Sequence, residues 1–402
     1  MSYTIFVGID VSKDSFAACT INKDRKILFE SNFTMDRDGF EGLTEMLSSF
    51  PRESILIGGE SSGCYHINLF SFLSEKGFSC VILNPLLISN FMKMSLRNTK
   101  TDRKDARSIS LFLSMFHESI PEKNILSSEL KDLAREREHI AQEIARIKND
   151  IEKLISILFP ELQRKVNIYN RSILKFISSF PSARSVKMAP RKKIRETLEY
   201  YGRGRKVDIS EEEIIKLARA SIASFHPAKE LILTQKASLL MFLMDRAEEI
   251  EEMLKKIYKD SEFNRDIDIL TSIKGIGDIT AMHFLSEIGD IKRFQSCRKL
   301  IAYAGLDPTV YQSGKYQGKS KLSKRGNRHI RRVIWLMTSM AIRFNEVFRE
   351  YFVKRRNEGL PYKKAVIATA HKLIRVIFSM LSHKRYFSYE SPSRIAYKEL
   401  NS

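Results

Sequence analysis

The chain has 402 residues, of which 43% are hydrophobic and 29% are charged, and its formal net charge is +20. This composition is typical of a globular protein with two or three domains. It argues against a membrane protein, because no apolar run approaches the roughly 18 residues that a span requires. The N-terminal stretch MSYTIFVGIDVSKD lacks the pattern of a signal peptide, so we expect a cytoplasmic protein.

The positive charge is concentrated in the last part of the chain. Residues 291–402 hold 25 Lys and Arg against 6 Asp and Glu, a net +19, which leaves +1 for residues 1–290. The basic residues are spread through several predicted helices and loops rather than along one amphipathic helix. Nucleic acid is therefore a better partner for this region than a membrane surface. The four cysteines show no zinc-ligand spacing.

Residues 1–120 alternate between strand and helix patterns. Apolar strand patterns cover 3–10, 15–21, 26–33, 54–60 and 78–85. Helix patterns cover 38–50 and 65–77. A three-strand meander followed by alternating helices and buried strands predicts an α/β ribonuclease-H/RuvC-like domain.

Residues 121–260 change to the spacing of long helices. Apolar residues recur every three or four positions at Ile140, Ile144, Ile147, Ile151, Leu154 and Leu158. The pattern returns at Leu240, Leu243, Ala247, Ile250, Leu254 and Ile257. Both runs predict coiled-coil seams, which could pair as an antiparallel hairpin or between subunits; the sequence leaves both open. The segment between them, about 160–235, is expected to be a helical insert.

Residues 261–402 are expected to form a basic, mainly α-helical domain. The stretch 269–290 has the apolar-x-Gly-apolar-Gly turn of a helix-hairpin-helix. There Gly275 and Gly277 would let backbone amides approach a phosphate, and Lys274 would add a charge. A glycine-rich basic loop and basic helices follow, and Trp335 is expected to belong to a helix core.

Four acidic residues stand where strands end or a helix begins. Asp10 ends the first strand, Glu60 ends the fourth, and Asp102 and Asp105 begin a helix that Thr101 could cap. The first and fourth strands of a ribonuclease-H-like sheet are neighbours, and residues three apart share a helical face. Four carboxylates at one point repel unless cations hold them. The sequence therefore predicts a site for two Mg²⁺ ions, with Mn²⁺ as a substitute.

With these residues in view, the chain resembles the DEDD transposases of bacterial insertion sequences, which include pilin-gene invertases and RNA-guided bridge recombinases. The resemblance is carried by VGIDVSKDSF, GGESSG, NTKTDRKDA, IKGIGDITA and AGLDPTVYQSGKYQGKSKLSKRGNRHIRR. It implies an enzyme that cuts and rejoins DNA at element ends and target, with the DEDD set as catalytic metal ligands. It also implies a nucleoid-associated homo-oligomer (dimer or tetramer). A member like the bridge recombinases would be guided by an RNA that the element encodes, whereas a member like the invertases would need a DNA site and host factors; the sequence leaves both open.

The serine of the Ser-Gly pair, Ser313, resembles the nucleophile of this family, which forms a transient phosphoserine link to DNA. By loop chemistry alone Ser320 and Ser323 are rivals. Phosphate contacts are expected from the basic residues beside the acids and around the loop, together with one asparagine. These residues are Lys100, Arg103, Lys104, Lys315, Lys319, Lys321, Lys324, Arg325, Asn327, Arg328, Arg331 and Arg332.

Three other interpretations remain open. The first is a RuvC-like, metal-dependent junction nuclease that hydrolyses DNA without a covalent intermediate. The second is a tyrosine recombinase, in which His329 and Arg332 form an H-x-x-R pattern upstream of Tyr351 or Tyr362. The third is a non-enzymatic binding protein on a dead nuclease fold, which the presence of all four carboxylates disfavours.

Overall fold

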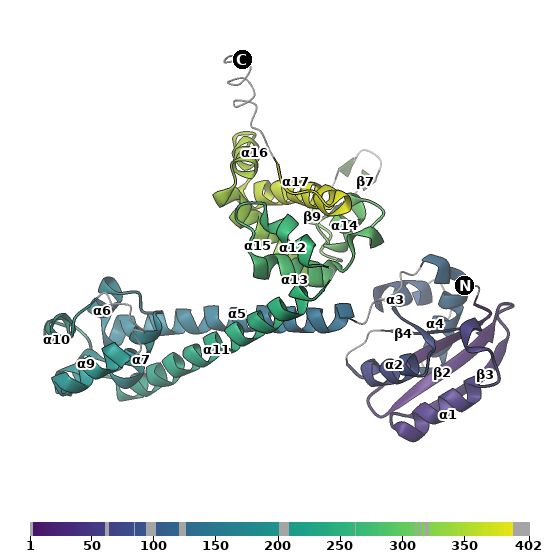
Figure 1. The fold of residues 1–402 in the computed structure, drawn as a ribbon, viewed down its shortest axis with the longest axis horizontal. Helices are drawn as coiled ribbons and strands as arrows, with labels where there is room; N and C mark the ends of the chain where they lie inside the picture. The colour runs from purple at the N-terminus through teal and green to yellow at the C-terminus, as the bar shows by residue number, and fades with distance from the viewer. Residues whose placement is uncertain are drawn as a thin grey trace, which may run out of the picture. The chain divides into compact units, whose positions relative to one another are not determined.

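A computed structural model describes residues 3–60, 64–83, 85–93, 102–119, 126–200, 209–261, 263–309, 312–313, 316–317 and 321–388. By its internal contacts the chain divides into two compact units, residues 1–125 and residues 126–402 (Figure 1). Each unit has its own hydrophobic cores and is described by itself.

The first unit is an α/β fold around a mixed five-stranded sheet of order β3-β2-β1-β4-β5. Its strands are β1 (Ile5–Val11), β2 (Ser15–Asn22), β3 (Ile27–Thr34), β4 (Ile55–Glu60) and β5 (Ser79–Leu83). Its α-helices are α1 (Arg37–Leu47), α2 (His66–Glu75), α3 (Pro85–Lys93) and α4 (Asp102–Phe116). β1, β2 and β3 form the antiparallel meander, and β4 and β5 run parallel to β1. The expected α/β class and the pairing of the first and fourth strands are confirmed.

Side chains that alternate along β1 build two cores, one on each face of the sheet. Val7 and Ile9 point to one face, where they pack in a core with Leu43 of α1. Phe6 points to the other face and packs in the core that α4 covers. The strands β1, β2 and β4 are therefore buried on both faces, whereas the edge strand β3 has no buried residue.

Helix α4 lies very close to the sheet because two facing strand positions have no side chain. Gly8 of β1 and Gly58 of β4 are register partners. A Cβ atom on Gly8 would lie 2.1 Å from the carbonyl oxygen of Ala106, and one on Gly58 would lie 2.8 Å from Leu113 Cδ1. Only glycine at these positions lets α4 approach the sheet so closely.

The second unit is mainly helical. Its helices are α5 (Leu126–Leu158), α6 (Pro160–Lys165), α7 (Arg171–Ser179), α8 (Ala183–Met188), α9 (Arg191–Tyr200), α10 (Glu211–Arg219), α11 (Pro227–Lys259), α12 (Asn264–Thr271), α13 (Asp278–Ile288), α14 (Cys297–Tyr303), α15 (Arg328–Phe344), α16 (Glu346–Asn357) and α17 (Tyr362–His383). Its short strands are β6 (Pro308–Thr309), β7 (Gln312–Ser313), β8 (Tyr316–Gln317) and β9 (Lys321–Leu322).

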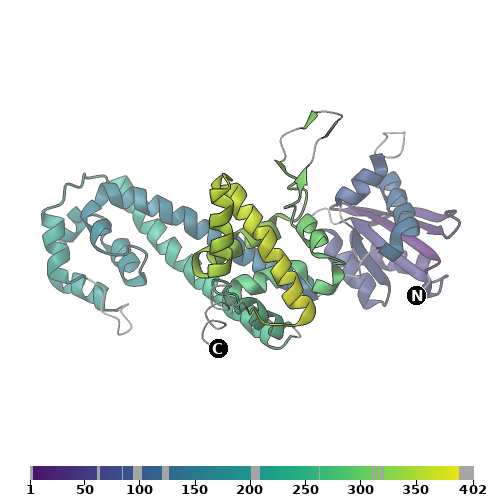
Figure 2. The same ribbon diagram turned by 90° about the horizontal axis from the view of Figure 1, so that it is seen from above.

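The two long helices α5 and α11 pack against each other (Figures 1 and 2). The Nζ atom of Lys236 lies 2.8 Å from Asp150 Oδ2, and Arg137 forms a second ion pair with Glu251. Because residue 150 meets 236 while residue 137 meets 251, the two helices run in opposite directions. Of the two pairings that the sequence left open, the chain itself forms the antiparallel hairpin.

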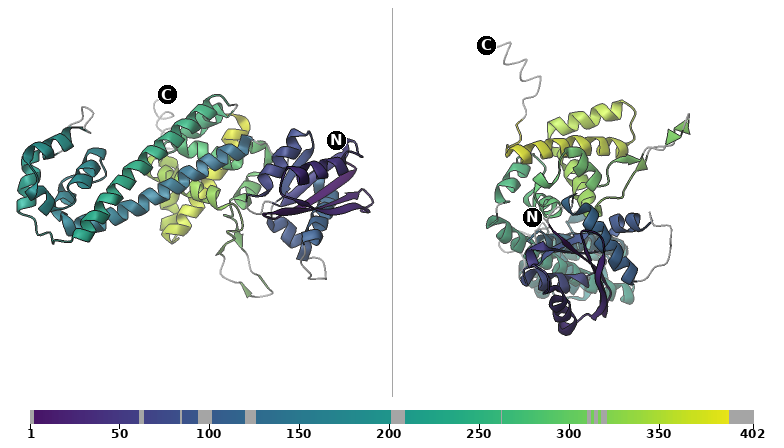
Figure 3. Two further views of the ribbon diagram at one scale, coloured as in Figure 1. Left: turned by 90° about the horizontal axis from the view of Figure 1, so that it is seen from below. Right: turned by 90° about the vertical axis from the view of Figure 1, so that its right-hand side faces the viewer.

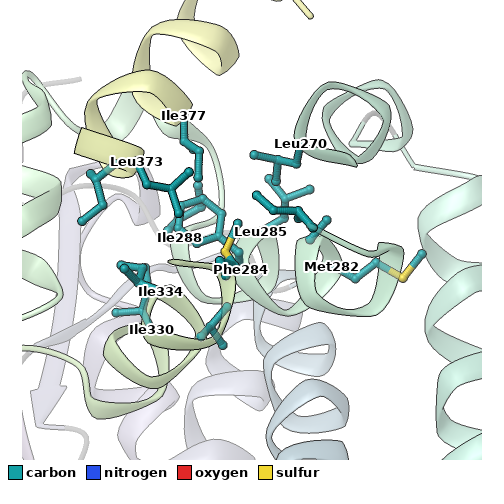
Figure 4. Close-up of a cluster of buried hydrophobic side chains, with 14 of the residues drawn as sticks. Leu270, Met282, Phe284, Leu285, Ile288, Ile330, Ile334, Leu373 and Ile377 are labelled. Atoms are coloured by element: carbon teal, nitrogen blue, oxygen red, sulfur yellow. The ribbon is translucent and has the colours of Figure 1, made fainter. Parts of the chain in front are cut away.

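Each end of this hairpin carries its own set of helices (Figure 3). Helices α6 to α10 build one core with the adjoining ends of α5 and α11. Helices α12 to α17 build the other, in which Leu285 of α13, Ile334 of α15 and Ile377 of α17 meet (Figure 4). Since α11 begins at Pro227, the expected insert of about 160–235 overlaps the first turns of that helix.

Among the described residues, α17 is the one helix long and apolar enough to cross a membrane, which the sequence analysis did not anticipate. Half of its most apolar window is buried inside the second unit. Leu373 and Ile377 are fully buried there. Its hydrophobicity is that of a core helix.

A carboxylate is buried in the same core. The side chain of Glu287 on α13 is fully buried, and Arg135 of α5 donates from Nε to its Oε1 atom at 2.7 Å. Arg135 Nη2 also donates to Oε2 at 3.0 Å, and Asn327 Nδ2 donates to Oε2 at 2.5 Å. Burial opposes the charged form, but the hydrogen bonds from Arg135 and Asn327 outweigh it and lower the pKa of Glu287.

Replacing Glu287 by Gln should destabilise the second unit by about 3 kcal/mol at pH 7, because a buried ion pair loses one partner. The lowered pKa means that Glu287 stabilises the folded state above the ordinary carboxyl pKa of 4.5. That contribution is lost as the pH falls through the lower folded-state pKa. Urea unfolding from pH 7 downward should therefore show the stability gap between wild type and variant closing.

The exposed Glu252 on α11 offers the matched control. Glu252→Gln should leave the free energy of unfolding within about 0.5 kcal/mol of wild type. If the free energies of unfolding of wild type and Glu287→Gln differed by the same amount at every pH, the charge of Glu287 would not be what stabilises the unit.

Replacing Gly8 by Ala should destabilise the first unit by about 1–3 kcal/mol, because α4 must move away from β1 to admit the methyl group. Gly42→Ala on α1 is the control, since its Cβ would meet Phe33 at an ordinary 3.6 Å. That variant should be neutral or slightly stabilising, as expected for Gly to Ala in a helix. Equal melting temperatures for Gly8→Ala and wild type would show that α4 does not depend on the close contact.

Candidate functional site

Two of the predicted acids lie together at one edge of the sheet. Ile9 of β1 and Gly59 of β4 are register partners in parallel strands, so Asp10 and Glu60 follow side by side at the carboxyl ends. Alternation along the strands turns both toward the face that α4 covers, the face of Gly8. Both side chains are half-buried and take part in polar interactions.

Helix α4 runs antiparallel to β1 and brings its first turn to this edge. Just after its end, the ring of His117 lies 5.1 Å from that of Phe6, near the start of β1. Ala106 lies over Gly8 in the middle of the strand. The start of α4, with Asp102 and Asp105, therefore lies beyond Gly8, toward the strand end that carries the other two acids.

The structure describes these four acids unevenly. The Asp105 side chain is half-buried, whereas the side chains of Asp102 and Arg103 lie outside the described part, as do Lys100 and the expected cap Thr101. Lys104 is exposed. Within the described side chains no group of three or more His, Cys, Asp or Glu is close enough to hold a metal ion. Asp10, Glu60 and Asp105 nevertheless offer carboxylate oxygens, the ligand type that Mg²⁺ takes.

The predicted serine loop forms two short antiparallel strand pairs. Pro308 pairs with Leu322 in β6 and β9, and Ser313 pairs with Tyr316 in β7 and β8. We call residues 308–322 the serine ribbon. The described parts of the ribbon give backbone positions for Ser313 and Lys321; Lys315, Lys319 and Ser320 lie outside the described residues.

The rival serine, Ser323, has a structural partner. Its hydroxyl donates to Asp307 Oδ1 at 2.7 Å, and its backbone amide donates to the Asp307 carbonyl at 2.9 Å. These bonds close the ribbon at its base, just outside the β6–β9 pair. A hydroxyl held in this way is a weaker candidate for a nucleophile than Ser313.

The turn between α12 and α13 holds the predicted glycines. Gly275 has a φ of +100°, and a Cβ there would lie 2.6 Å from the carbonyl oxygen of Met340 on α15. Packing alone therefore requires glycine at this position. Gly277 is exposed with open space around its Cα atom, and Lys274 is exposed beside it. The phosphate contact predicted for this turn stays a prediction.

Several residues predicted to contact phosphate hold the second unit together. Asn327 caps α15 by accepting from the amide of His329 at 2.9 Å, in addition to its bond with Glu287. Arg331 Nη1 donates to the Ala304 carbonyl at 3.0 Å. Lys324, Arg325 and Arg328 are exposed, and Lys324 has a φ of +52°.

A second acid with a buried side chain, Glu138 on α5, was not singled out from the sequence. His329 Nδ1 lies 2.8 Å from its Oε2 atom, and Arg332 Nε lies 3.0 Å from its Oε1 atom. Both residues of the H-x-x-R pattern thus tie α15 to α5, which weakens the tyrosine-recombinase interpretation. No sequence signal marked Glu138, because it is one of many acids on a long amphipathic helix.

Comparison with known proteins places these features in a family. Residues 7–160 match the transposase family of the IS110 DEDD type, and residues 267–353 match the transposase family IS116/IS110/IS902. The first match contains all four acids at the sheet edge and at the start of α4. The second contains the α12–α13 turn, the serine ribbon and all of α15.

Curated relatives match over nearly the whole chain. The 44.8 kDa protein of insertion element IS116 from Streptomyces clavuligerus is 23% identical, over 96% of this chain and 97% of its own. The 42 kDa protein of insertion element IS900 from Mycobacterium paratuberculosis is 25% identical, over 95% and 96%. The pilin gene-inverting protein of Moraxella bovis is 21% identical, over 95% and 97%. The family resemblance is thereby confirmed, and the chain belongs to the IS110/IS116 family of DEDD transposases of bacterial insertion sequences.

Proposed function

We propose that the protein moves an insertion sequence by cutting and rejoining DNA, with Ser313 as the nucleophile and the acidic edge of the first unit as its metal site. The observation that carries this proposal is the convergence of Asp10, Glu60 and the start of α4 at one sheet edge. The insertion-element relatives match the chain over both units, which also supports the proposal.

In this mechanism the Ser313 hydroxyl oxygen attacks a backbone phosphorus atom. A serine–phosphate bond forms as the bond from phosphorus to one deoxyribose oxygen breaks; the serine proton is lost and the departing sugar oxygen gains one. A hydroxyl from a second DNA end then attacks the phosphoserine, which restores the serine and completes the exchange. One phosphoester replaces another at each step, so the strands are rejoined without ATP.

The carboxylates fit a divalent metal by their chemistry, and Asp10, Glu60, Asp102 and Asp105 would hold it. When bound, two Mg²⁺ ions would stabilise the negative charge on the attacking and departing oxygens, and Mn²⁺ would substitute. The fold of the first unit, with neighbouring β1 and β4 under α4, is compatible with a RuvC-like domain. The α12–α13 turn would serve as a helix-hairpin-helix that binds the DNA backbone.

The basic second unit would bind the substrates. Its exposed cations, which include Lys324, Arg325 and Arg328, would contact phosphates of the element ends and the target. An RNA encoded by the element would select the DNA sequence by base pairing, and the protein would bind this RNA by its shape. We also propose that the enzyme acts in the cytoplasm, on the nucleoid, as a homo-oligomer in which the serine of one chain meets the acids of another.

The serine mechanism predicts a covalent protein–DNA adduct that depends on Ser313. Purified protein, Mg²⁺ and RNA transcribed from the element's flank would be incubated with labelled DNA that spans the element's end junction. On a denaturing gel, wild type should form an adduct and Ser313→Ala should form none. Ser323→Ala is the matched control and should keep the adduct, since Ser323 holds Asp307.

Strand cleavage by Ser313→Ala without an adduct would overturn the serine mechanism. The activity would then be that of a RuvC-like nuclease, which hydrolyses DNA directly with water.

If the acidic edge holds the metal, each of its carboxylates should be required for adduct formation. Asp10→Asn and Asp105→Asn should each lower adduct formation by at least about a hundredfold, because removing one ligand charge weakens the metal site. Asp14→Asn is the control, since Asp14 is exposed in the turn after β1. EDTA should abolish the adduct and added Mg²⁺ or Mn²⁺ should restore it. Full activity of Asp10→Asn would remove the acidic edge from the mechanism.

A further inference from the structure

A cavity of about 320 Å³ lies at the base of the serine ribbon. It opens between β9, α15 and α17 within the second unit. Its lining residues are Leu306, Leu322, Arg328, Arg331, Arg332, Ile334, Trp335, Lys363, Ile367 and Ala370. The volume is at the lower end of the range of about 300–1,000 Å³ that is usual for small-ligand pockets.

The cavity has an apolar floor and a basic rim. Leu306, Ile334 and Ala370 are fully buried beneath it. Trp335 is half-buried and does not belong to the buried core of the unit, so its expected core role was wrong. Among the described residues of the lining, every charged side chain is a cation and none is an acid.

Two of the four cations are bonded to other elements of the unit, and for the other two no such bond is found among the described residues. Arg331 donates to the Ala304 carbonyl, and Arg332 pairs with Glu138. Arg328 and Lys363 are exposed, and no ion pair of either is found among the described residues; Arg328 Nε donates to Nε2 of the neighbouring His329 at 3.3 Å. The rim therefore carries uncompensated positive charge beside a flat aromatic surface.

We propose that this cavity binds one unpaired nucleotide, with its base against Trp335 and its phosphate near Arg328 and Lys363. A base offers a planar face that stacks on an indole in any sequence, and a phosphate matches the rim in charge. A base that is still paired in a duplex cannot enter such a pocket, so the nucleotide must be extruded or single-stranded.

The position of the cavity indicates how nucleotide binding could assist strand exchange. Leu322 of β9 belongs to both the cavity and the ribbon that carries Ser313. A nucleotide held here would anchor a strand at the base of the ribbon that carries Ser313, and strand opening would accompany cleavage. The inference rests on the proposed function, in that nucleic acid is the partner of the second unit.

The chain provides its own reporter, because Trp335 is its only tryptophan. Full-length protein would be titrated with a short single-stranded DNA, the RNA of the same sequence and the matching blunt duplex, with N-acetyltryptophanamide as a correction for light absorption by the nucleic acid. Stacking should quench Trp335 emission with the single strands at least about fivefold more than with the duplex. The DNA and RNA arms decide which nucleic acid supplies the base.

Paired variants test the site itself. Lys363→Ala removes a rim cation, and the single strand should then bind about tenfold more weakly in the quenching titration. Lys364→Ala removes the neighbouring exposed lysine, which does not line the cavity, and should bind within about twofold of wild type. Ile367 is half-buried on α17, and Ile367→Trp would fill the cavity with its indole ring. In a Trp335→Phe, Ile367→Trp double variant the nucleotide could no longer enter, so nucleic acid should not quench the emission of the remaining tryptophan.

Equal quenching by duplex and single strand, or equal effects of Lys363→Ala and Lys364→Ala, would overturn the inference. Unchanged emission on addition of any nucleic acid would overturn it too and would favour a side chain from a second copy of the chain as the occupant. The adduct assay is independent of these readouts. An adduct without a change in Trp335 emission would contradict nucleotide binding in the cavity and leave the serine mechanism standing. Quenching of Trp335 without an adduct would support the cavity and contradict the serine mechanism.

Discussion

The arrangement of the first unit depends on one close contact, that of α4 with β1 at Gly8 and with β4 at Gly58. A helix normally stays at a side chain's distance from the sheet below it, and here two adjacent glycines remove that distance. The contact fixes the distance of α4 from the sheet and its position along the strand. As a result the start of α4 and the ends of β1 and β4 meet at one edge, where Asp10 and Glu60 already lie.

The second unit shows how a strongly basic region can be held together. Most of the positive charge of the chain lies in it, yet two acids are placed inside. Glu287 on α13 accepts from Arg135 of α5, and Glu138 on α5 pairs with His329 and Arg332 of α15. These acids join α5 to α13 and to α15. The cations that face them serve the fold, and those that face solvent remain free to meet phosphates.

Much of this arrangement could be predicted from the sequence, for physical reasons. Strands are recognised by alternation or by continuous apolar runs, and these patterns placed Asp10 and Glu60 where strands end. The pairing of the first and fourth strands followed from the order expected of a ribonuclease-H-like sheet, and it was predicted correctly. Long helices are recognised by the spacing of their apolar residues, but spacing does not say which helix is the partner. The hairpin of α5 and α11 therefore needed the ion pairs of the structure to be established.

Side-chain roles were harder to predict because they depend on neighbours far along the chain. Arg332 and Asn327 have the residue types of phosphate contacts, yet their partners are Glu138 and Glu287, which lie in other helices. Trp335 lies among apolar residues in the sequence, as a core residue would. Only the fold shows that α17 leaves it facing a cavity.

The antiparallel pairing of α5 and α11 also sets a fixed distance within the second unit. At 1.5 Å per residue, helices of 33 residues are each about 50 Å long. Packed side by side, they resist bending far better than either would alone, and they keep two hydrophobic cores apart. The hairpin is thus a rigid spacer: anything bound at its two ends is separated by about 50 Å, the length of roughly 15 base pairs of duplex DNA.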